Sequence, residues 1–130
     1  MEFSVTRCVA FSETDASGRV HFTEILKWVE DAEHQFLKER KIPICSPESG
    51  WPRVNVQCDY RAPLHFGDEV VVNLTLIRIG KSSLTWSFEI QDSQSAVAAE
   101  GSLVTVFVLG GKAGAVIPTE IRSRLESASC

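Results

Sequence analysis

The pattern of hydrophobic and polar residues changes along this chain of 130 residues. From Phe3 to Phe11 apolar side chains alternate with smaller ones, which predicts a strand. From Thr23 to Arg40 the apolar positions recur at steps of three and four, which predicts an amphipathic helix with one buried face. The residues of that face are Ile25, Trp28, Val29, Ala32 and Phe36, and those of the opposite side are Lys27, Asp31, His34 and Lys38.

Both ends of this helix carry their own signals. Thr23 is expected to be the N-cap, with Glu24 in the first turn. Basic residues gather at the other end, and Pro43 is expected to stop the helix. Because a helix start presents unpaired N–H groups, a carboxylate held just upstream, such as Asp15, can lie beside a site that binds an oxyanion.

The rest of the chain predicts four more strands and a short helix. The strands are expected at residues 53–60, 69–79, 83–91 and 96–109, and Pro118 is expected to open a helix that runs to about Ser127. The turns between the strands are short, so neighbouring strands must be antiparallel. The order predicts a single α+β domain over residues 1–130, in which a five-stranded antiparallel sheet wraps around one long central helix. This arrangement is the hotdog fold.

Composition excludes several classes of protein. The formal net charge of −4 at pH 7 argues against a general nucleic-acid binder, which usually carries a basic excess. No apolar run approaches the roughly 20 residues of a membrane span. The first residues, MEFSVTR, lack the basic and apolar regions of a secretory signal. We therefore expect a cytoplasmic protein without a membrane span.

The cysteines and histidines predict neither a metal site nor a disulfide framework. The 4 cysteines form no C-x-x-C pair, and the 3 histidines add no ligand spacing. Cys8 and Cys58 are expected to be buried in strands as small hydrophobic residues. The sequence thus predicts no bound metal.

Several segments together resemble a known family. The loop and the helix read ETDASGRVHF and KWVEDAEHQFL, and the later segments read CDYRAPLHFGDEV, IGKSSLTWSFEI and VIPTEIRSRLE. They are similar to the signature of the 4-hydroxybenzoyl-CoA thioesterase family, whose members are hotdog-fold acyl-CoA thioesterases. The similarity covers nearly the whole chain.

The resemblance implies catalytic roles for two residues. In the family the Asp at the position of Asp15 acts as nucleophile or general base, and the backbone N–H at the position of Phe22 polarises the thioester carbonyl. An Asp with a reference pKa of about 3.9 is ionised at pH 7 and is ready for either role. A thiolate leaves with a pKa of about 8.5, so little help from a general acid is needed. One carboxylate and one oxyanion donor can therefore suffice.

The resemblance also implies contacts with the substrate. Gly18 is expected to allow a close backbone approach or a positive φ. His21 is expected to contact the substrate or to shape the loop, and Arg78 and Lys81 to pair with the phosphates of coenzyme A. Coenzyme A is then part of the substrate, so no separate cofactor is implied.

Four acids leave other interpretations open. Asp15 can serve as an Asx-turn or capping residue without a catalytic role. Glu13 stands where relatives commonly have Asp, and it is expected to face solvent. Glu30 and Glu33 are alternative catalytic acids, because other hotdog proteins place a catalytic Glu on the central helix. Most helical glutamates, however, are simply solvated.

The favoured function is hydrolysis of an acyl-CoA or acyl-carrier-protein thioester to the free acid and thiol. A hotdog hydratase or dehydratase fits less well, because its motif places Asp and His five apart, whereas Asp15 and His21 are six apart. A non-catalytic acyl-CoA-binding protein of the sensor type would lack the loop acid and carry a DNA-binding segment. A structural or interaction module would release no thiol.

A homo-oligomer, either a dimer or a tetramer, is also expected. A hotdog subunit leaves a sheet edge and part of its acyl site incomplete, and exposed edges favour pairing with another chain. The sequence does not distinguish an aromatic from an aliphatic acyl group in the substrate.

Overall fold

A five-stranded antiparallel sheet dominates the computed structural model, which describes residues 2–127. Its strand order is β1-β4-β5-β6-β3. The strands are β1 (Glu2–Cys8), β3 (Arg53–Tyr60), β4 (Glu69–Ile79), β5 (Ser83–Gln91) and β6 (Val97–Val106). Met1 and residues 128–130, which the predicted domain includes, lie outside the described residues.

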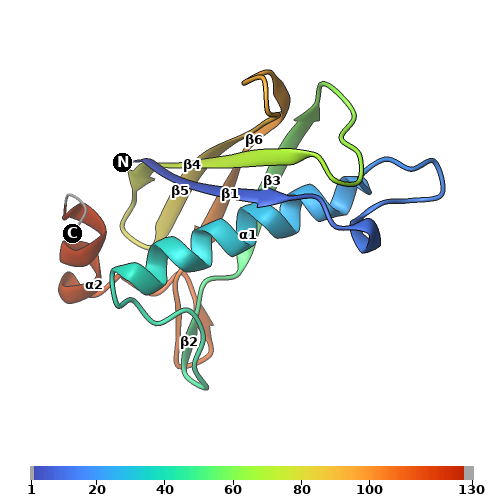
Figure 1. Ribbon diagram of the computed structural model, residues 1–130. Coiled ribbons are helices and arrows are strands. Elements are labelled where there is room, and N and C mark those ends of the chain that lie inside the picture. The colour runs from blue at the N-terminus through green and yellow to red at the C-terminus, as the bar shows by residue number, and fades with distance from the viewer. Residues whose placement is uncertain (1, 128–130) are drawn as a thin grey trace.

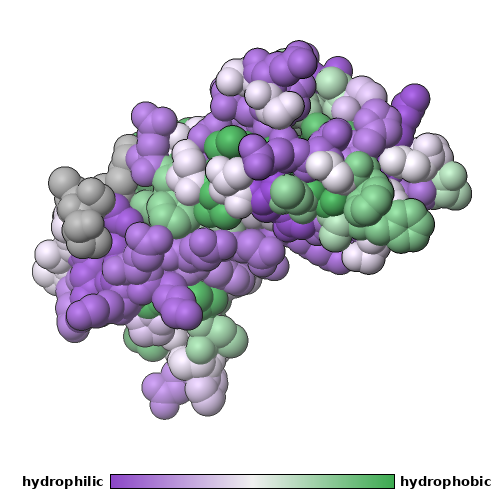
Figure 2. Space-filling model, in the orientation of Figure 1, coloured by the Kyte–Doolittle hydropathy of each residue, from purple (hydrophilic) through white to green (hydrophobic). Residues whose placement is uncertain are grey.

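The long helix α1 (Phe22–Glu39) lies across one face of this sheet (Figure 1). The apolar face predicted from its periodicity is buried, and Leu37 adds to it. The outward side forms a largely hydrophilic band on the surface (Figure 2). Because a fully buried large apolar side chain contributes roughly 1.5–3 kcal/mol, this stripe is what holds α1 on the sheet.

The inner face of the sheet supplies the other half of the core. Buried side chains alternate with more accessible ones along β4 and β5. Phe36 of α1 packs edge to face against Trp86 of β5 at 5.2 Å and against Phe3 of β1 at 5.9 Å between ring centroids. The buried hydrophobic residues of sheet and helix form one cluster.

Smaller elements complete the described chain. A 3-10 helix, η1 (Phe11–Glu13), follows β1. A three-stranded sheet of β2 (Ser49–Gly50), β7 (Val108–Leu109) and β8 (Lys112–Ala113) lies below α1 in Figure 1. The second helix, α2 (Thr119–Glu126), lies beside the carboxyl end of α1, where Arg124 donates to the Lys41 carbonyl at 2.7 Å. Residues 2–127 thus contain two α-helices. The predicted fold class named one long central helix, and the short second helix agrees with the one expected from Pro118.

Two predicted strands are shorter than expected. β1 ends at Cys8 instead of Phe11, because η1 turns the chain there. The last predicted strand is divided between β6 and β7 at Phe107. The Phe107 amide donates to the Ser82 carbonyl at 2.8 Å, and its side chain is buried. Cys8 lies on the outward side of β1 and is exposed, so its predicted burial was wrong; Cys58 is partly buried.

The carboxyl end of α1 stops before Pro43. Lys41 adopts a left-handed conformation with φ of 57°. The amides of Lys41 and Ile42 donate to the carbonyls of Lys38 and Leu37 at 3.0 and 2.9 Å. These bonds satisfy carbonyls that the helix leaves free. The helix thus ends through its own backbone geometry, and Pro43 is not the cause.

Replacing Phe36 with Ala should lower the free energy of unfolding by about 3 to 5 kcal/mol. The reason is that Phe36 is only 1% exposed and would leave a cavity between Phe3 and Trp86. Urea denaturation followed by tryptophan fluorescence measures this loss. Gln35→Ala, at an exposed neighbouring position, should change it by less than about 0.5 kcal/mol. A loss below about 1 kcal/mol for Phe36→Ala would contradict this packing.

Candidate functional site

A groove of about 440 Å³ lies where three segments meet: the first turn of α1, the loop before it, and the end of β3. The lining residues are Asp15, Ser17, Arg19, Val20, Phe22, Ile25, Tyr60, Arg61, Ala62, Pro63 and Leu64. The structure thus brings the two residues predicted to act on a thioester, Asp15 and Phe22, to one cavity.

The loop that carries Asp15 folds back on itself. The Asp15 amide donates to the Arg19 carbonyl at 2.8 Å, and the Gly18 amide donates to the Asp15 carbonyl at 3.0 Å. Gly18 has φ of +83°, while no other described atom lies within 4 Å of the position a Cβ would take. The positive φ favours glycine here, and no close approach by another described segment requires it.

The same loop is fastened to the segment that follows β3. The Val20 amide donates to the Leu64 carbonyl at 2.8 Å. Arg19 forms an antiparallel bridge with His65. These bonds, together with the packing of Val20 against the core, hold the loop beside the groove.

The carboxylate of Asp15 is exposed, and Ser17 orients it. Oδ1 accepts a hydrogen bond from the Ser17 amide at 2.8 Å and from the Ser17 hydroxyl at 2.5 Å. The bond from the Ser17 side chain, followed by that from its amide, lowers the pKa of Asp15 below its ordinary value of 3.8. The group is therefore ionised at neutral pH. The contacts are those of an Asx-turn, so this turn and an ionised carboxylate coexist at Asp15.

The N-cap of α1 is His21, so the prediction of Thr23 was wrong. The Thr23 amide donates to His21 Nδ1 at 3.2 Å, and the Thr23 hydroxyl lies 2.7 Å from the same nitrogen. Sequence rules favour Ser, Thr, Asp or Asn at this position, so they do not predict a histidine as the N-cap. Its ring also stacks on Phe22, with 4.8 Å between centroids. In this geometry His21 shapes the start of the helix.

The amide of Phe22 is the first of the helix. It has no carbonyl four residues earlier in the helix to bond. Within residues 2–127 no hydrogen bond uses this N–H. On the other side of the same peptide unit, the His21 carbonyl accepts from the Glu24 amide at 2.9 Å. Phe22 therefore offers a free donor, on a fixed peptide, in the residue that shares the groove with Asp15.

Glu13 does not face solvent as predicted. Its side chain is 14% exposed and pairs with Arg7. It also accepts from the indole N–H of Trp28 and from the Ala10 amide, both at 2.8 Å. Burial raises its pKa, but the bonds from Ala10 and Trp28 and the charge of Arg7 outweigh burial and lower it below the ordinary 4.5. Glu13 therefore ties the loop to β1 and α1, and it does not line the groove.

The two glutamates of α1 also lie outside the groove. Glu33 is fully buried and forms an ion pair with Arg53 of β3, so the expectation of a solvated side chain was wrong. Burial raises the pKa of Glu33, and the Arg53 charge opposes this rise. Glu30 lies 3.5 Å from the same guanidinium. Both acids connect α1 to β3.

Arg78 and Lys81 lie far from the groove within one chain. Arg78 is near the end of β4, and Lys81 is in the turn that follows. The Ile117 amide, just before α2, donates to the Lys81 carbonyl at 3.0 Å. This end of the sheet lies beside the carboxyl end of α1, opposite the loop of Asp15 (Figure 1). A contact between these cations and a substrate in the groove would need a second copy of the chain.

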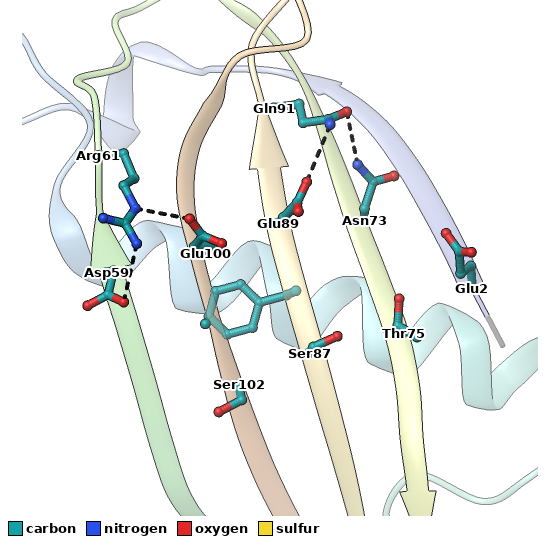
Figure 3. A pocket seen from close by; sticks show the side chains of 12 residues that line it. Glu2, Asp59, Arg61, Asn73, Thr75, Ser87, Glu89, Gln91, Glu100 and Ser102 are labelled. Atoms are coloured by element: carbon teal, nitrogen blue, oxygen red, sulfur yellow. Dashed lines mark hydrogen bonds and ion pairs between the residues drawn. The ribbon is translucent and has the colours of Figure 1, made fainter.

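A larger hollow of about 550 Å³ lies on the face of the sheet away from α1 (Figure 3). Three acids occupy paired positions on adjacent strands across it: Glu89, Glu100 and Asp59. Arg61 balances part of this charge, at 2.9 Å from Glu100 and 3.8 Å from Asp59. The hollow contains no helix start and would repel an anionic ligand. The smaller groove is therefore the candidate active site.

Tyr60 was absent from the predicted site residues. Its hydroxyl donates to the Phe22 carbonyl at 2.8 Å, and its ring packs edge to face on Phe22 at 6.4 Å. The two residues are 38 positions apart, so only the fold brings them together. No local pattern around Tyr60 indicated this contact.

Within residues 2–127 no group of three or more His, Cys, Asp or Glu is arranged to hold a metal ion. Neither described helix is both long and apolar enough to cross a membrane.

Comparison with known proteins agrees with the geometry. Residues 17–99 match the family model described as Thioesterase superfamily. A 1,4-dihydroxy-2-naphthoyl-CoA hydrolase of Synechococcus sp. (strain CC9605) is 30% identical over 103 residues, which are 72% of this chain and 69% of that protein. The protein of the same name from Prochlorococcus marinus (strain MIT 9303) is 29% identical over 104 residues, with 71% and 68% covered.

A solved structure supports the fold. The crystal structure of a hypothetical protein from Aquifex aeolicus matches with a TM-score of 0.88 at 28% identity, over 95% of this chain and 99% of that one. The predicted hotdog fold is thereby confirmed. The match to the family model begins two positions after Asp15, so it does not include that residue.

Replacing Glu13 with Gln should lower the free energy of unfolding by about 1 to 3 kcal/mol at pH 7, because Arg7 loses its charged acceptor and one of the two acceptor oxygens is lost. The pKa of Glu13 in the folded state lies below its ordinary 4.5. The carboxylate therefore contributes stability above that pH and loses the contribution as the pH falls through the folded pKa. Urea denaturation from pH 7 to about pH 3 should show the difference between variant and wild type shrinking in acid.

The matched control is Glu120→Gln, which removes an exposed pair with Arg124 on α2. It should change stability by less than about 0.5 kcal/mol. An equally stable Glu13→Gln protein at pH 7, or a difference that grows in acid, would contradict the role assigned to Glu13.

Proposed function

Because this chain belongs to the thioesterase superfamily, we propose that it hydrolyses an acyl-CoA thioester at the groove that Asp15 and Phe22 line. One observation carries the proposal: an ionised carboxylate and a free helix-terminal amide share one cavity. The relatives support thioester hydrolysis in general. They do not single out the narrower 4-hydroxybenzoyl-CoA family.

Asp15 starts the reaction in this mechanism. Its carboxylate either attacks the thioester carbonyl carbon or takes a proton from a water molecule that attacks. The two bonds from Ser17 both use Oδ1, so neither of them occupies Oδ2, the oxygen assigned to this step. The carboxylate of Asp15 does not first have to lose a proton, because its lowered pKa keeps it ionised at neutral pH.

Phe22 stabilises the charge that then develops. As the carbonyl carbon becomes tetrahedral, the oxygen gains negative charge, and the Phe22 N–H donates to it. The carbon–sulfur bond breaks with its electron pair on sulfur, and the thiolate leaves without needing a strong acid. If Asp15 is the nucleophile, water then hydrolyses the mixed anhydride. If it is the base, the acid is formed directly.

We propose an aromatic acyl group in the substrate. Two relatives, 29% and 30% identical to this chain, are named 1,4-dihydroxy-2-naphthoyl-CoA hydrolase. In this chain, the rings of Phe22 and Tyr60 both line the groove and meet edge to face, an arrangement that suits a further aromatic ring. An acyl-carrier-protein thioester is the second substrate class. A hydratase is disfavoured, because no histidine is among the residues that line the groove.

We also propose that the protein is a homo-oligomer that pairs through β3. This strand is at the edge of the sheet, and Val54 and Val56 are 59% and 41% exposed. A long edge with exposed apolar side chains favours pairing with another chain. A second copy at this edge would lie next to the groove, because Tyr60 is the last residue of β3.

Replacing Asp15 with Asn should lower kcat at least about 100-fold, which is roughly 2.7 kcal/mol, because the amide can neither attack nor accept the proton. Binding of the substrate should survive, since the shape is nearly preserved. Thiol release from an aromatic acyl-CoA measures kcat, and the melting temperature reports any loss of the turn.

Asp31→Asn is the matched control, because Asp31 is exposed on the outer side of α1. It should leave kcat unchanged. A folded Asp15→Asn protein with kcat within about tenfold of wild type would contradict the catalytic role assigned to Asp15.

Sedimentation at micromolar concentration should show a dimer or a tetramer of the 14.4 kDa chain. Val56→Lys should shift this distribution toward the monomer, because a charge on the edge opposes pairing. Gln94→Lys, in an exposed turn away from β3, should not. A wild-type protein that sediments only at 14.4 kDa would rule out the proposed assembly.

A further inference from the structure

The first three residues of α1 precede its first core residue. Phe22 is 60% exposed, and the first buried residue of the helix is Ile25. Polar contacts therefore position the start of the helix together with the burial of Ile25. This requirement matters because Phe22 carries the free amide.

Polar contacts reach this turn from two directions. From the loop, the His21 amide donates to the Glu13 carbonyl at 2.9 Å. From the sheet, the Tyr60 hydroxyl donates to the Phe22 carbonyl at 2.8 Å. Among the hydrogen bonds of residues 2–127, the one from Tyr60 is the only link between the large sheet and the main chain of this turn.

The bond from Tyr60 bears directly on the free donor. The Phe22 carbonyl and the Phe22 N–H belong to the two peptide units that meet at one Cα. One unit is held by the bond from the Glu24 amide to the His21 carbonyl, and the other by Tyr60. The Phe22 N–H lies in the plane of the first unit, and the bond from Tyr60 to the second unit holds the Cα about which that plane can turn.

The hydroxyl keeps its proton over the whole neutral range. Burial, together with the adjacent Cys58 thiol, raises the pKa of Tyr60 to about 12. Tyr60 therefore remains a hydrogen-bond donor across the neutral range, in which Asp15 is ionised.

We propose that Tyr60 is a positioning residue, which aims the Phe22 N–H at the carbonyl oxygen of the substrate. The proposal rests on the proposed function. Tyr60 acts through Phe22 and does not itself contact the thioester bond of the substrate. A preorganised donor is worth more than a mobile one, because no reorganisation is needed as charge develops.

Tyr60→Phe tests the proposal, because it removes only the hydroxyl. We expect kcat to fall about five- to tenfold, with KM within about twofold, since the Phe22 N–H is then aimed less well at the oxygen that gains charge in the transition state. Ser4→Ala is the matched control. It removes a hydroxyl bond to Asn73 at 2.6 Å, on β1 and β4, and should leave kcat unchanged.

Infrared spectroscopy reads the donor directly. The probe is a benzoyl-CoA analogue in which a methylene group replaces the thioester sulfur. Binding to wild type should lower its carbonyl stretching frequency, because the Phe22 N–H polarises the bond. Tyr60→Phe should show a smaller shift, and Ser4→Ala the full shift. A change that only lowers stability would not alter the frequency in folded protein.

A second test keeps the hydroxyl group of Tyr60 and changes only its pKa. Tyr60 is the only tyrosine in the chain, so biosynthetic incorporation of difluorotyrosine labels this position alone. Fluorine lowers the pKa of the phenol. The labelled protein should therefore lose kcat at a lower pH than the unlabelled protein, as the hydroxyl ionises and stops donating.

The outcomes are distinguishable. An active wild type whose Tyr60→Phe variant keeps kcat within twofold and shows the full carbonyl shift would overturn the role of Tyr60 and leave the proposed function standing. An unchanged pH profile of kcat in the labelled protein would also overturn the role of Tyr60 and leave the proposed function standing. A wild type that releases no thiol and does not shift the carbonyl would overturn both.

Discussion

The burial of α1 against the inner face of the sheet is the constraint on which the rest of the structure depends. Trp28 and Phe36 are almost fully buried and fix where the helix lies. Its first turn then projects beyond the core, at the end of the sheet where the preceding loop and β3 arrive. Phe22 with its unpaired amide and Asp15 with its exposed carboxylate line one groove there, because the helix starts three residues before its first buried side chain, Ile25.

The acids of this chain divide into two kinds. Glu13 and Glu33 are shielded from water and paired with Arg7 and Arg53, so they fasten the loop and the helix to the sheet. Asp15 is exposed and bonded only within its own turn. A carboxylate that the fold does not need as a tie can react without loosening the elements around it. The groove therefore combines a rigid frame with one free reactive group.

The elements were predictable to the extent that their signals were local. The helix and the sheet follow from periodicities of about 3.6 and 2 residues, which a single segment contains. The features that the sequence did not predict are the histidine cap, the partly buried Glu13, the fully buried Glu33, and the contact of Tyr60 with Phe22. Three of them depend on pairs of residues that meet only after folding: Glu13 with Trp28, Glu33 with Arg53, and Tyr60 with Phe22. Asp15 and Phe22 were found through resemblance, and their shared groove needed the structure.

Release of free coenzyme A from a panel of acyl-CoA thioesters by the purified wild-type protein tests the central claim most directly. The panel should contain benzoyl, phenylacetyl and hydroxynaphthoyl thioesters beside straight-chain thioesters of increasing length. The account predicts catalytic turnover, with the aromatic thioesters hydrolysed at the highest kcat/KM. A folded, assembled protein that releases no thiol from any member of the panel would contradict it.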